Sequence, residues 1–495
     1  MLLDLEYPSW ILFRPNIEPV CHTNNSKRSH VMRRIAKLFG IVTLSLAASS
    51  PGYADDLVTI LQIAFDNDPT LRQSKATYRA NRENMVQSRS ALLPTLAASA
   101  NTSRLTSGPT DSQYISGVNP DTGASTVFRR QDHSFQPGLN NHGWSMSLNQ
   151  AVVNLAGWYT FQSAQASDKA GAVNLAAQEQ DLIVRVASAY FNVLRARDLL
   201  DTNVQEEEAA LRSLEQTQQR EEVGLVAITD VFDSQAAYDL ARNTTILQEN
   251  FLLSAYEVLE AITGQSHPNI DVLREDFPVI NVDGNLREWE SQAGSNSLAI
   301  ASAKFNLEAN EESLKARKSD HLPTIALQAA FAHDVTAPIN QSGIQIGGGA
   351  FDRTRLALTL SIPIFQGGAV SSRRRQAEYN VVAAKESLEF TKRQLTQNVR
   401  DSFRRVNTDV LVIAQRQQSI NSAQLALDAT ELGAEVGTRN IVEVLRAREN
   451  LYRALRLYAD ARYTYVVDSL LLKQVTGILT PQDIIELNDW LQVEA

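Results

Sequence analysis

The amino-acid sequence predicts an α+β membrane protein: each chain contributes four strands to a trimeric 12-stranded transmembrane β-barrel, continued by a long α-helical coiled-coil barrel. Four segments alternate apolar and polar side chains over about ten residues each, the length of a tilted membrane strand. Two long helical segments without proline follow the alternating segments. The chain also shows an internal two-fold repeat, because residues 436–444 match residues 223–231 and the register continues without a gap to Gly264 and Gly477.

The N-terminal segment has the features of a secretory signal peptide. Basic residues precede an apolar run at 38–48 that is too short to span a bilayer, and small residues follow it up to Ala54. We expect residues 1–54 to be removed, with Met32 as an alternative start. Removal takes away the only cysteine, Cys21, so the mature chain can form no disulfide and no thiolate metal site. Six Lys/Arg and three Asp/Glu leave with the leader, which lowers the formal net charge from −10 to −13 and argues against a nucleic-acid partner.

Beyond the leader, the pattern predicts two structural repeats. The first covers 55–264 and the second 296–477, separated by a mixed inter-repeat segment at 265–295 and followed by a short polar tail at 478–495. Each repeat is expected to contain a helix, a β-hairpin, a long helix, a Val-Gly turn and a second helix. The hairpins are predicted at about 95–154 and 324–364, each preceded by a helix that ends before Pro94 or Pro323.

The alternating segments predict strands with one apolar and one polar face. In the clearest of them Leu356, Leu358 and Leu360 share one face, while Thr359 and Ser361 share the other. The predicted loops, 108–142 and 336–352, are rich in Gly, Pro, Ser, Asn and Asp. A soluble sandwich with one wet face would show the same alternation. The small polar second face in an exported chain favours a membrane barrel.

The long helices and the strand number together predict an assembly of several copies. The second long helix, predicted from about Gly368 to Ala434, has an apolar heptad seam that indicates a left-handed coiled coil. The seam residues are Val399, Val406, Ile413, Ile420 and Leu427. Four strands cannot close a barrel, and open strand edges are not tolerated in lipid. Three copies would give 12 strands, whereas two would give eight, with little lumen.

Taken together, the sequence resembles the TolC family of outer-membrane efflux channel-tunnels, and it is closer to TolC itself than to the lipid-anchored members. The resemblance covers essentially all of residues 55–490. The motifs that carry it are LLP at 92–94, LNQ at 148–150, YFNVL at 190–194, VGLVAITDV at 223–231, LPT at 322–324, SIPIFQGG at 361–368 and VGTRNIVEV at 436–444.

The resemblance implies a function and a set of partners. The function is the outer-membrane exit channel of tripartite efflux or type I secretion systems, a passive conduit from periplasm to exterior gated at its periplasmic tip. The implied partners are two further copies in a homotrimer, a periplasmic adaptor (membrane fusion) protein, an inner-membrane RND, ABC or MFS transporter, and outer-membrane lipid. The helical part is expected in the periplasm. The cargo, drugs or secreted proteins, is left open.

The resemblance also implies roles for residues near the second Val-Gly turn. Glu443 matches a carboxylate of the family's pore constriction, but Arg446 stands where the family has a second carboxylate. Because Glu443 and Arg446 are three residues apart on one helix, we expect them to pair and to give a weaker or mixed-charge cation filter. Arg439 matches a residue that latches this hairpin to a neighbouring one near Thr229 and Asp230. The family's tyrosine partner is replaced by Ala434.

The two turns themselves are the predicted adaptor contact. Their residues are Val223, Gly224, Leu225, Val436, Gly437 and Thr438. Simple turn chemistry is the alternative explanation for the two glycines, and ordinary solvated helix ends are the alternative for the charged residues nearby.

An enzyme is the disfavoured class. The seven histidines are scattered without metal-ligand spacing, and neither a nucleophile elbow nor a Walker loop is present. We therefore expect no catalytic residues, no metal and no cofactor. The main rival to a channel is an exported trimeric coiled-coil scaffold or adhesin of the outer membrane without transport.

Overall fold

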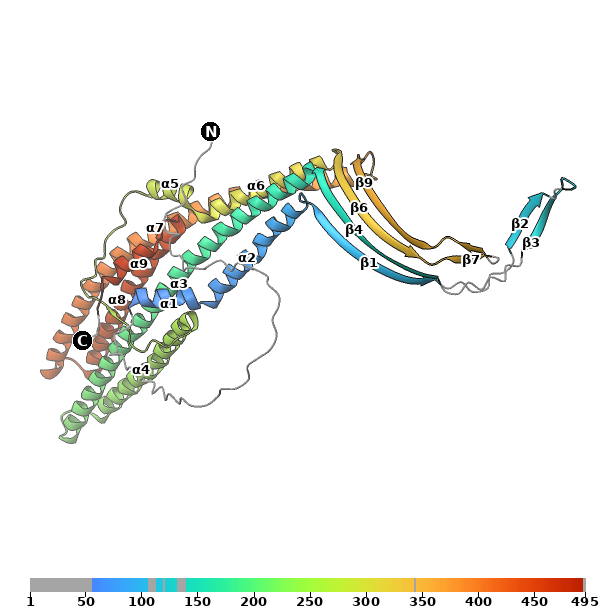
Figure 1. Ribbon diagram of the computed structural model, residues 1–495. Helices are drawn as coiled ribbons and strands as arrows, with labels where there is room; N and C mark the ends of the chain where they lie inside the picture. Colours follow the sequence, from blue (N-terminus) through green and yellow to red (C-terminus); the bar gives the residue numbers. More distant parts are fainter. Residues whose placement is uncertain (1–55, 106–112, 119–120, 131–138, 342–343, 493–495) are drawn as a thin grey trace, which may run out of the picture. The chain divides into compact units, whose positions relative to one another are not determined.

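The computed structural model describes residues 56–492 except 106–112, 119–120, 131–138 and 342–343 (Figure 1). The predicted signal peptide, with Met32 and Cys21, lies outside the described residues.

Four long strands form one antiparallel sheet with the order β1-β4-β6-β9. Their bounds are Thr95–Leu105, Leu139–Val153, Thr324–Thr336 and Gly349–Ser361. They make the two predicted hairpins. Two short hairpins lie in the connections: β2 (Gln113–Val118) with β3 (Ser125–Arg130), and β7 (Ile339–Gln341) with β8 (Ile344–Ile346).

The predicted loops at 108–142 and 336–352 were therefore too long. Strand β4 already begins at Leu139 and β9 at Gly349, and the short hairpins occupy part of what remains. The hydrogen bonds between strands join backbone groups and do not depend on the side chains. Strand β4 therefore includes Asn141 and Gly143, although these residues do not continue the alternation of apolar and polar side chains.

The register of the sheet confirms the two predicted faces. Residues directly opposite each other lie on one face, and Leu96, Leu148, Ala329 and Leu356 form one such row. Three residues along, Ser99, Ser145, Ala332 and Arg353 form a row of the opposite face. The Oγ atoms of Ser99 and Ser145 are 2.9 Å apart across the strands. One face of the sheet is thus apolar across all four strands, and the other is small and polar.

The helices flank the strands in sequence. The first half contains α1 (Leu57–Asn67), α2 (Pro69–Ser90), α3 (Leu155–Glu222) and α4 (Ile228–Thr263); the second contains α6 (Leu298–Ser319), α7 (Ala369–Glu435) and α8 (Ile441–Thr476). Helices α3 and α7 have 68 and 67 residues, which makes each about 100 Å long. Helix α2 packs on α3, α3 on α6 and α6 on α7, as Figure 1 shows. The helix order α2-α3-α6-α7 therefore parallels the strand order.

Two short helices were missed by the sequence interpretation. Helix α5 (Leu286–Asn296) lies inside the stretch expected to be mixed, and α9 (Pro481–Asn488) lies in the supposedly polar tail. A capping box between Asn285 and Glu288 starts α5. Helix α9 buries Ile484, and strand β10 (Leu491–Gln492) after it pairs with β5 (Val272–Leu273) of the inter-repeat segment.

The predicted heptad seam of α7 is confirmed. Val399, Val406, Ile413 and Leu427 are buried and Ile420 is half-buried, whereas Gln417 and Gln424 on the companion positions are exposed. The main core lies where α1, α3, α4, α8 and α9 meet, around the fully buried Tyr190 and Phe191. No helix among the described ranges combines the length and the apolar character needed to cross a membrane.

Candidate functional site

The α3–α4 turn is a glycine-closed helix end with an exposed apolar surface. Gly224 has a φ of 74°, a left-handed conformation that residues with a Cβ rarely adopt. The Leu225 amide donates to the Arg220 carbonyl at 2.8 Å, which closes the end of α3. Val223 and Leu225 are each 70% exposed. Two large apolar side chains are thus presented at the tip of this hairpin.

The α7–α8 turn has the same local form. Gly437 has a φ of 79°, and the Thr438 amide donates to the Gly433 carbonyl at 2.8 Å. Val436 is 75% exposed. The Asn440 side chain then caps α8 by accepting from the Glu443 amide at 2.9 Å. The predicted helix-turn-helix conformation is therefore found at both stretches.

Glu443 pairs with a different arginine from the one predicted. Its Oε2 lies 3.3 Å from Nη1 of Arg439, whereas the expected pair with Arg446 is not formed and Arg446 is exposed. Gly433 of α7 allows Arg439 to take this position. A Cβ atom at residue 433 would lie only 2.7 Å from Cγ of Arg439. The missing side chain lets the stem of Arg439 lie against α7 and directs its guanidinium along the first turn of α8.

The single chain does not bring Arg439 to Thr229 and Asp230. Those two residues lie on the first turn of α4, at the other hairpin, and Asp230 is half-buried there. The proposed latch joins neighbouring hairpins, so it stays a prediction about the assembly.

A pair of carboxyl groups between α7 and α8 was missed by sequence reasoning. Asp409 of α7 and Asp468 of α8 are neighbours that act on each other's pKa, and Oδ2 of Asp409 is buried without a hydrogen-bond partner in the described part of the chain. Burial and the neighbouring Asp468 carboxylate raise the pKa of Asp409 to about 6, and burial raises the pKa of Asp468. Arg405 acts against both shifts. The residues are 59 positions apart, so only the pairing register of the two helices could have revealed them.

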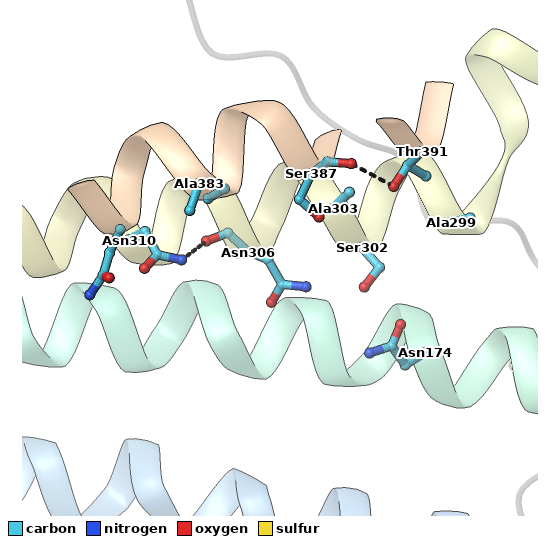
Figure 2. Close-up of a pocket in the computed structure, with 11 residues that line it drawn as sticks. Asn174, Ala299, Ser302, Ala303, Asn306, Asn310, Ala383, Ser387 and Thr391 are labelled. Carbon is cyan, nitrogen blue, oxygen red and sulfur yellow. Dashed lines mark hydrogen bonds between the residues drawn. The ribbon is translucent and has the colours of Figure 1, made fainter. Parts of the chain in front are cut away.

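An uncharged groove runs across α3, α6 and α7 (Figure 2). It has a volume of about 590 Å³ and is lined by amide, hydroxyl and alanine side chains, among them Asn174, Asn306 and Ser387. Asn310 donates from Nδ2 to the Asn306 carbonyl at 2.8 Å, and Thr391 donates to the Ser387 carbonyl at 2.8 Å. Such a surface offers hydrogen bonds to water and polar solutes without attracting either sign of charge.

Known proteins resemble the chain along most of its length. The family described as outer membrane efflux protein matches residues 60–265 and 289–478. The outer membrane protein TolC of Vibrio cholerae is 32% identical over 465 residues, which cover 93% of this chain and 99% of the relative. TolC of Escherichia coli K12 is 34% identical over 462 residues, covering 91% and 88%. The proteases secretion protein PrtF of Dickeya chrysanthemi is 25% identical over 469 residues, covering 93% and 96%.

Solved structures resemble the fold as well. The outer membrane protein VceC of Vibrio cholerae aligns with a TM-score of 0.69 at 16% identity and covers 85% of this chain and 96% of its own. The CmeC outer membrane channel of Campylobacter jejuni aligns with a TM-score of 0.68 at 16% identity, covering 89% and 90%. At these identities the likeness concerns the fold.

Proposed function

This chain belongs to the outer membrane efflux protein family, and on that premise we propose how its parts build an exit channel from the periplasm. Proteins of this family are transport proteins of the outer membrane rather than enzymes, and the chain is an outer-membrane channel for efflux and type I secretion, with its helical tunnel in the periplasm. The finer points proposed below are the stoichiometry, the gate and the partners.

The sheet supports a closed barrel made from three copies. Strands β1 and β9 form the two edges of the sheet, and they run in opposite directions because each of the three neighbouring pairs in the order β1-β4-β6-β9 is antiparallel. Strand β9 of one copy can therefore pair with β1 of the next without any change of topology. Three copies give twelve strands, an even number in the range of membrane barrels. The internal two-fold repeat then places two equivalent hairpins per copy around the wall.

The apolar face carries this proposal, because it extends across all four strands and its side chains are exposed in the single chain. Leu356, Leu358, Leu360, Ile362 and Ile364 are between 54% and 92% exposed. From Leu356 to Ile364 is eight residue steps, about 26 Å of extended chain or about 20 Å of membrane when the chain is tilted, and Ile362 and Ile364 follow the end of β9 at Ser361. Lipid is the occupant that tolerates such a surface, and the polar opposite face then lines the lumen.

Exposed apolar side chains on the helices support the same assembly. Phe232, Leu240, Leu247 and Phe251 of α4 are each more than half exposed, and so are Leu411 and Leu425 of α7. A monomer in water rarely leaves such a contiguous series uncovered. Neighbouring copies would cover them and continue the barrel as a helical tunnel.

The tips of the hairpins form the proposed gate and docking surface. Three copies of Glu443, each held by its own Arg439 and followed by Arg446, would ring the narrow mouth with mixed charge. Arg439 would exchange Glu443 for Thr229 and Asp230 of a neighbouring hairpin when the latch is closed. The exposed Val223, Leu225 and Val436 would meet a periplasmic adaptor that connects to an RND, ABC or MFS transporter.

Single-channel recording tests the proposal directly. When the mature protein is purified and reconstituted in a planar lipid bilayer, we expect discrete single-channel openings of low conductance. These openings should be seen over a wide range of applied voltage. A trimer without conductance would instead favour the scaffold or adhesin. Deleting the gene and measuring both antibiotic sensitivity and secreted protein would then define the cargo.

A further inference from the structure

The polar face of the sheet carries a column of three large side chains on β9. Phe351, Arg353 and Arg355 alternate along the strand and therefore lie on the same face, each about 7 Å from the next along the backbone. All three are exposed, and Phe351 is 45% exposed although its face is otherwise small and polar. An aromatic ring and two guanidinium groups thus lie together on the face that we assign to the lumen.

The residues beside this column are small, so the three side chains have free space next to them. The row of Arg355 contains Ala97, Ser147 and Ala330. Phe351 lies opposite Asp334, and the next residue of that row, on β4, is Gly143. A Cβ atom at residue 143 would lie 2.7 Å from Oδ1 of Asp334, so the glycine makes room for this carboxylate.

A recess of about 480 Å³ lies beside the column, at the ends of the strands that meet the two short hairpins. Its lining comes from all four strands and includes Asn101, Asn141, Phe351 and Arg353. Sites for small molecules have volumes in this range, and they combine apolar surface with a few polar groups that fix the orientation of the ligand. The recess therefore has the size and the chemistry to hold an organic solute.

The charges beside the recess leave one cation without a partner. Arg353 pairs with Asp334, whereas Arg355 forms no ion pair with any residue that the structure describes. Within the described strands, Arg353, Arg355 and Asp334 are the charged side chains of the polar face. Two arginines and one aspartate give this face a net charge of +1 per chain, so three copies would give +3. An anion is the solute that such a wall attracts.

We propose that Phe351, Arg353 and Arg355 form a binding site for amphipathic organic anions inside the exit barrel, with one site in each chain. The apolar part of the ligand lies on the Phe351 ring, and its carboxylate, sulfonate or phosphate group accepts hydrogen bonds from the Arg355 guanidinium. Water and salt reach the exposed arginine, so the site binds weakly and releases its ligand, as passage through a channel requires. This inference rests on the proposed function, in which the polar face lines the lumen, and it names a class of solute.

The test measures binding of pyrenetetrasulfonate, a fluorescent aromatic tetra-anion, from its anisotropy as purified protein is added in a non-ionic detergent. The variants are Arg355→Gln, which removes the charge, Arg355→Lys, which keeps it, and Phe351→Ser, which removes the ring. Arg104→Gln is the matched control, because Arg104 on β1 is also exposed and forms no ion pair with a described residue. It lies eight residues from Leu96 and therefore on the apolar side of the same sheet.

At about 0.01 M salt we expect Arg355→Gln to weaken binding about tenfold and Phe351→Ser about fivefold, while Arg355→Lys changes it at most about threefold and Arg104→Gln leaves it unchanged. At about 1 M salt the effect of Arg355→Gln should largely disappear, because the Debye length falls from about 30 Å to about 3 Å.

Unchanged binding by Arg355→Gln, or an equal loss in Arg104→Gln, would overturn the site. A tenfold loss shared by Arg355→Lys would overturn the role of the charge, and unchanged binding by Phe351→Ser would overturn the amphipathic class of ligand. Binding is measured without a bilayer, so the two proposals are tested separately: a wild-type protein that binds the probe and gives no conductance would overturn the channel function and support the site.

Discussion

Replacing Asp409 with asparagine should make the protein more stable at alkaline pH and leave it nearly unchanged at acid pH. Asp409 on α7 faces Asp468 on α8, and Arg405 is the charged neighbour that opposes their raised pKa values. Two carboxyl groups this close cannot both ionise without repulsion, so one proton is retained by the folded protein more tightly than by the unfolded chain.

The direction of the pH dependence follows from the raised pKa. The pKa of Asp409 moves from 3.8 to about 6 on folding, so the stability contributed by the shared proton is fully present below pH 3.8 and is lost as the pH rises through about 6. The whole shift corresponds to about 3 kcal/mol, but solvent reaches the pair, and we expect about 1 kcal/mol after screening. Asparagine removes the repulsion at every pH.

Thermal unfolding followed by circular dichroism at pH 8 and pH 4.5 measures this effect. We expect Asp409→Asn to unfold about 1–2 °C above the wild type at pH 8 and within error of it at pH 4.5. Asp428→Asn is the control, since Asp428 is an exposed carboxylate on the same helix that accepts from Gln424 at 2.8 Å. An equal gain at both pH values, or a gain in the control, would refute the shared-proton explanation.

Four further predictions concern the gate and the seam. Arg439→Ala should raise single-channel conductance, because it removes the latch between hairpins; an unchanged conductance would contradict the latch. Glu443→Ala should lower the cation preference measured from reversal potentials, and strong cation selectivity that survives the change would contradict the mixed-charge ring. Gly437→Val should abolish drug resistance while the trimer still assembles, whereas loss of the trimer would show that the glycine serves only the turn. Val399→Ala should lower the free energy of unfolding by about 2 kcal/mol, measured by denaturant unfolding of the trimer, because Val399 is fully buried in the α7 seam. A loss below about 0.5 kcal/mol would contradict a stabilising role of the seam.

The order of strands, long helices and turns was predictable, because it depends on the period of the apolar residues and on the spacing of repeated motifs in the sequence. The alternation around Leu358 fixes which face of β9 is apolar, and the seven-residue spacing through Val399 and Ile413 fixes the buried face of α7. The repeated Val-Gly pairs predicted two turns, and both glycines have the left-handed backbone that this reading requires.

What could not be predicted depends on short segments and on contacts between helices. Helix α5 is only 11 residues long, and its main sequence signal is the Asn285 cap, which is also typical of a turn. The pairing of Arg439 with Glu443 could not be predicted either, because it depends on the space that Gly433 of α7 leaves for the Arg439 side chain. Arg448 of α8 donates to the Ala209 carbonyl of α3 and to the Glu431 carboxylate of α7, and these contacts could not be predicted because the partners lie 239 and 17 residues away in the sequence.

The central claim is that one chain supplies a third of a hollow conduit. The most direct test is the protein mass of the purified mature protein in detergent, measured by native mass spectrometry or by light scattering corrected for bound detergent. The account predicts a single species with three times the mass of the mature chain. A monomer, or a dimer that still conducts, would contradict it.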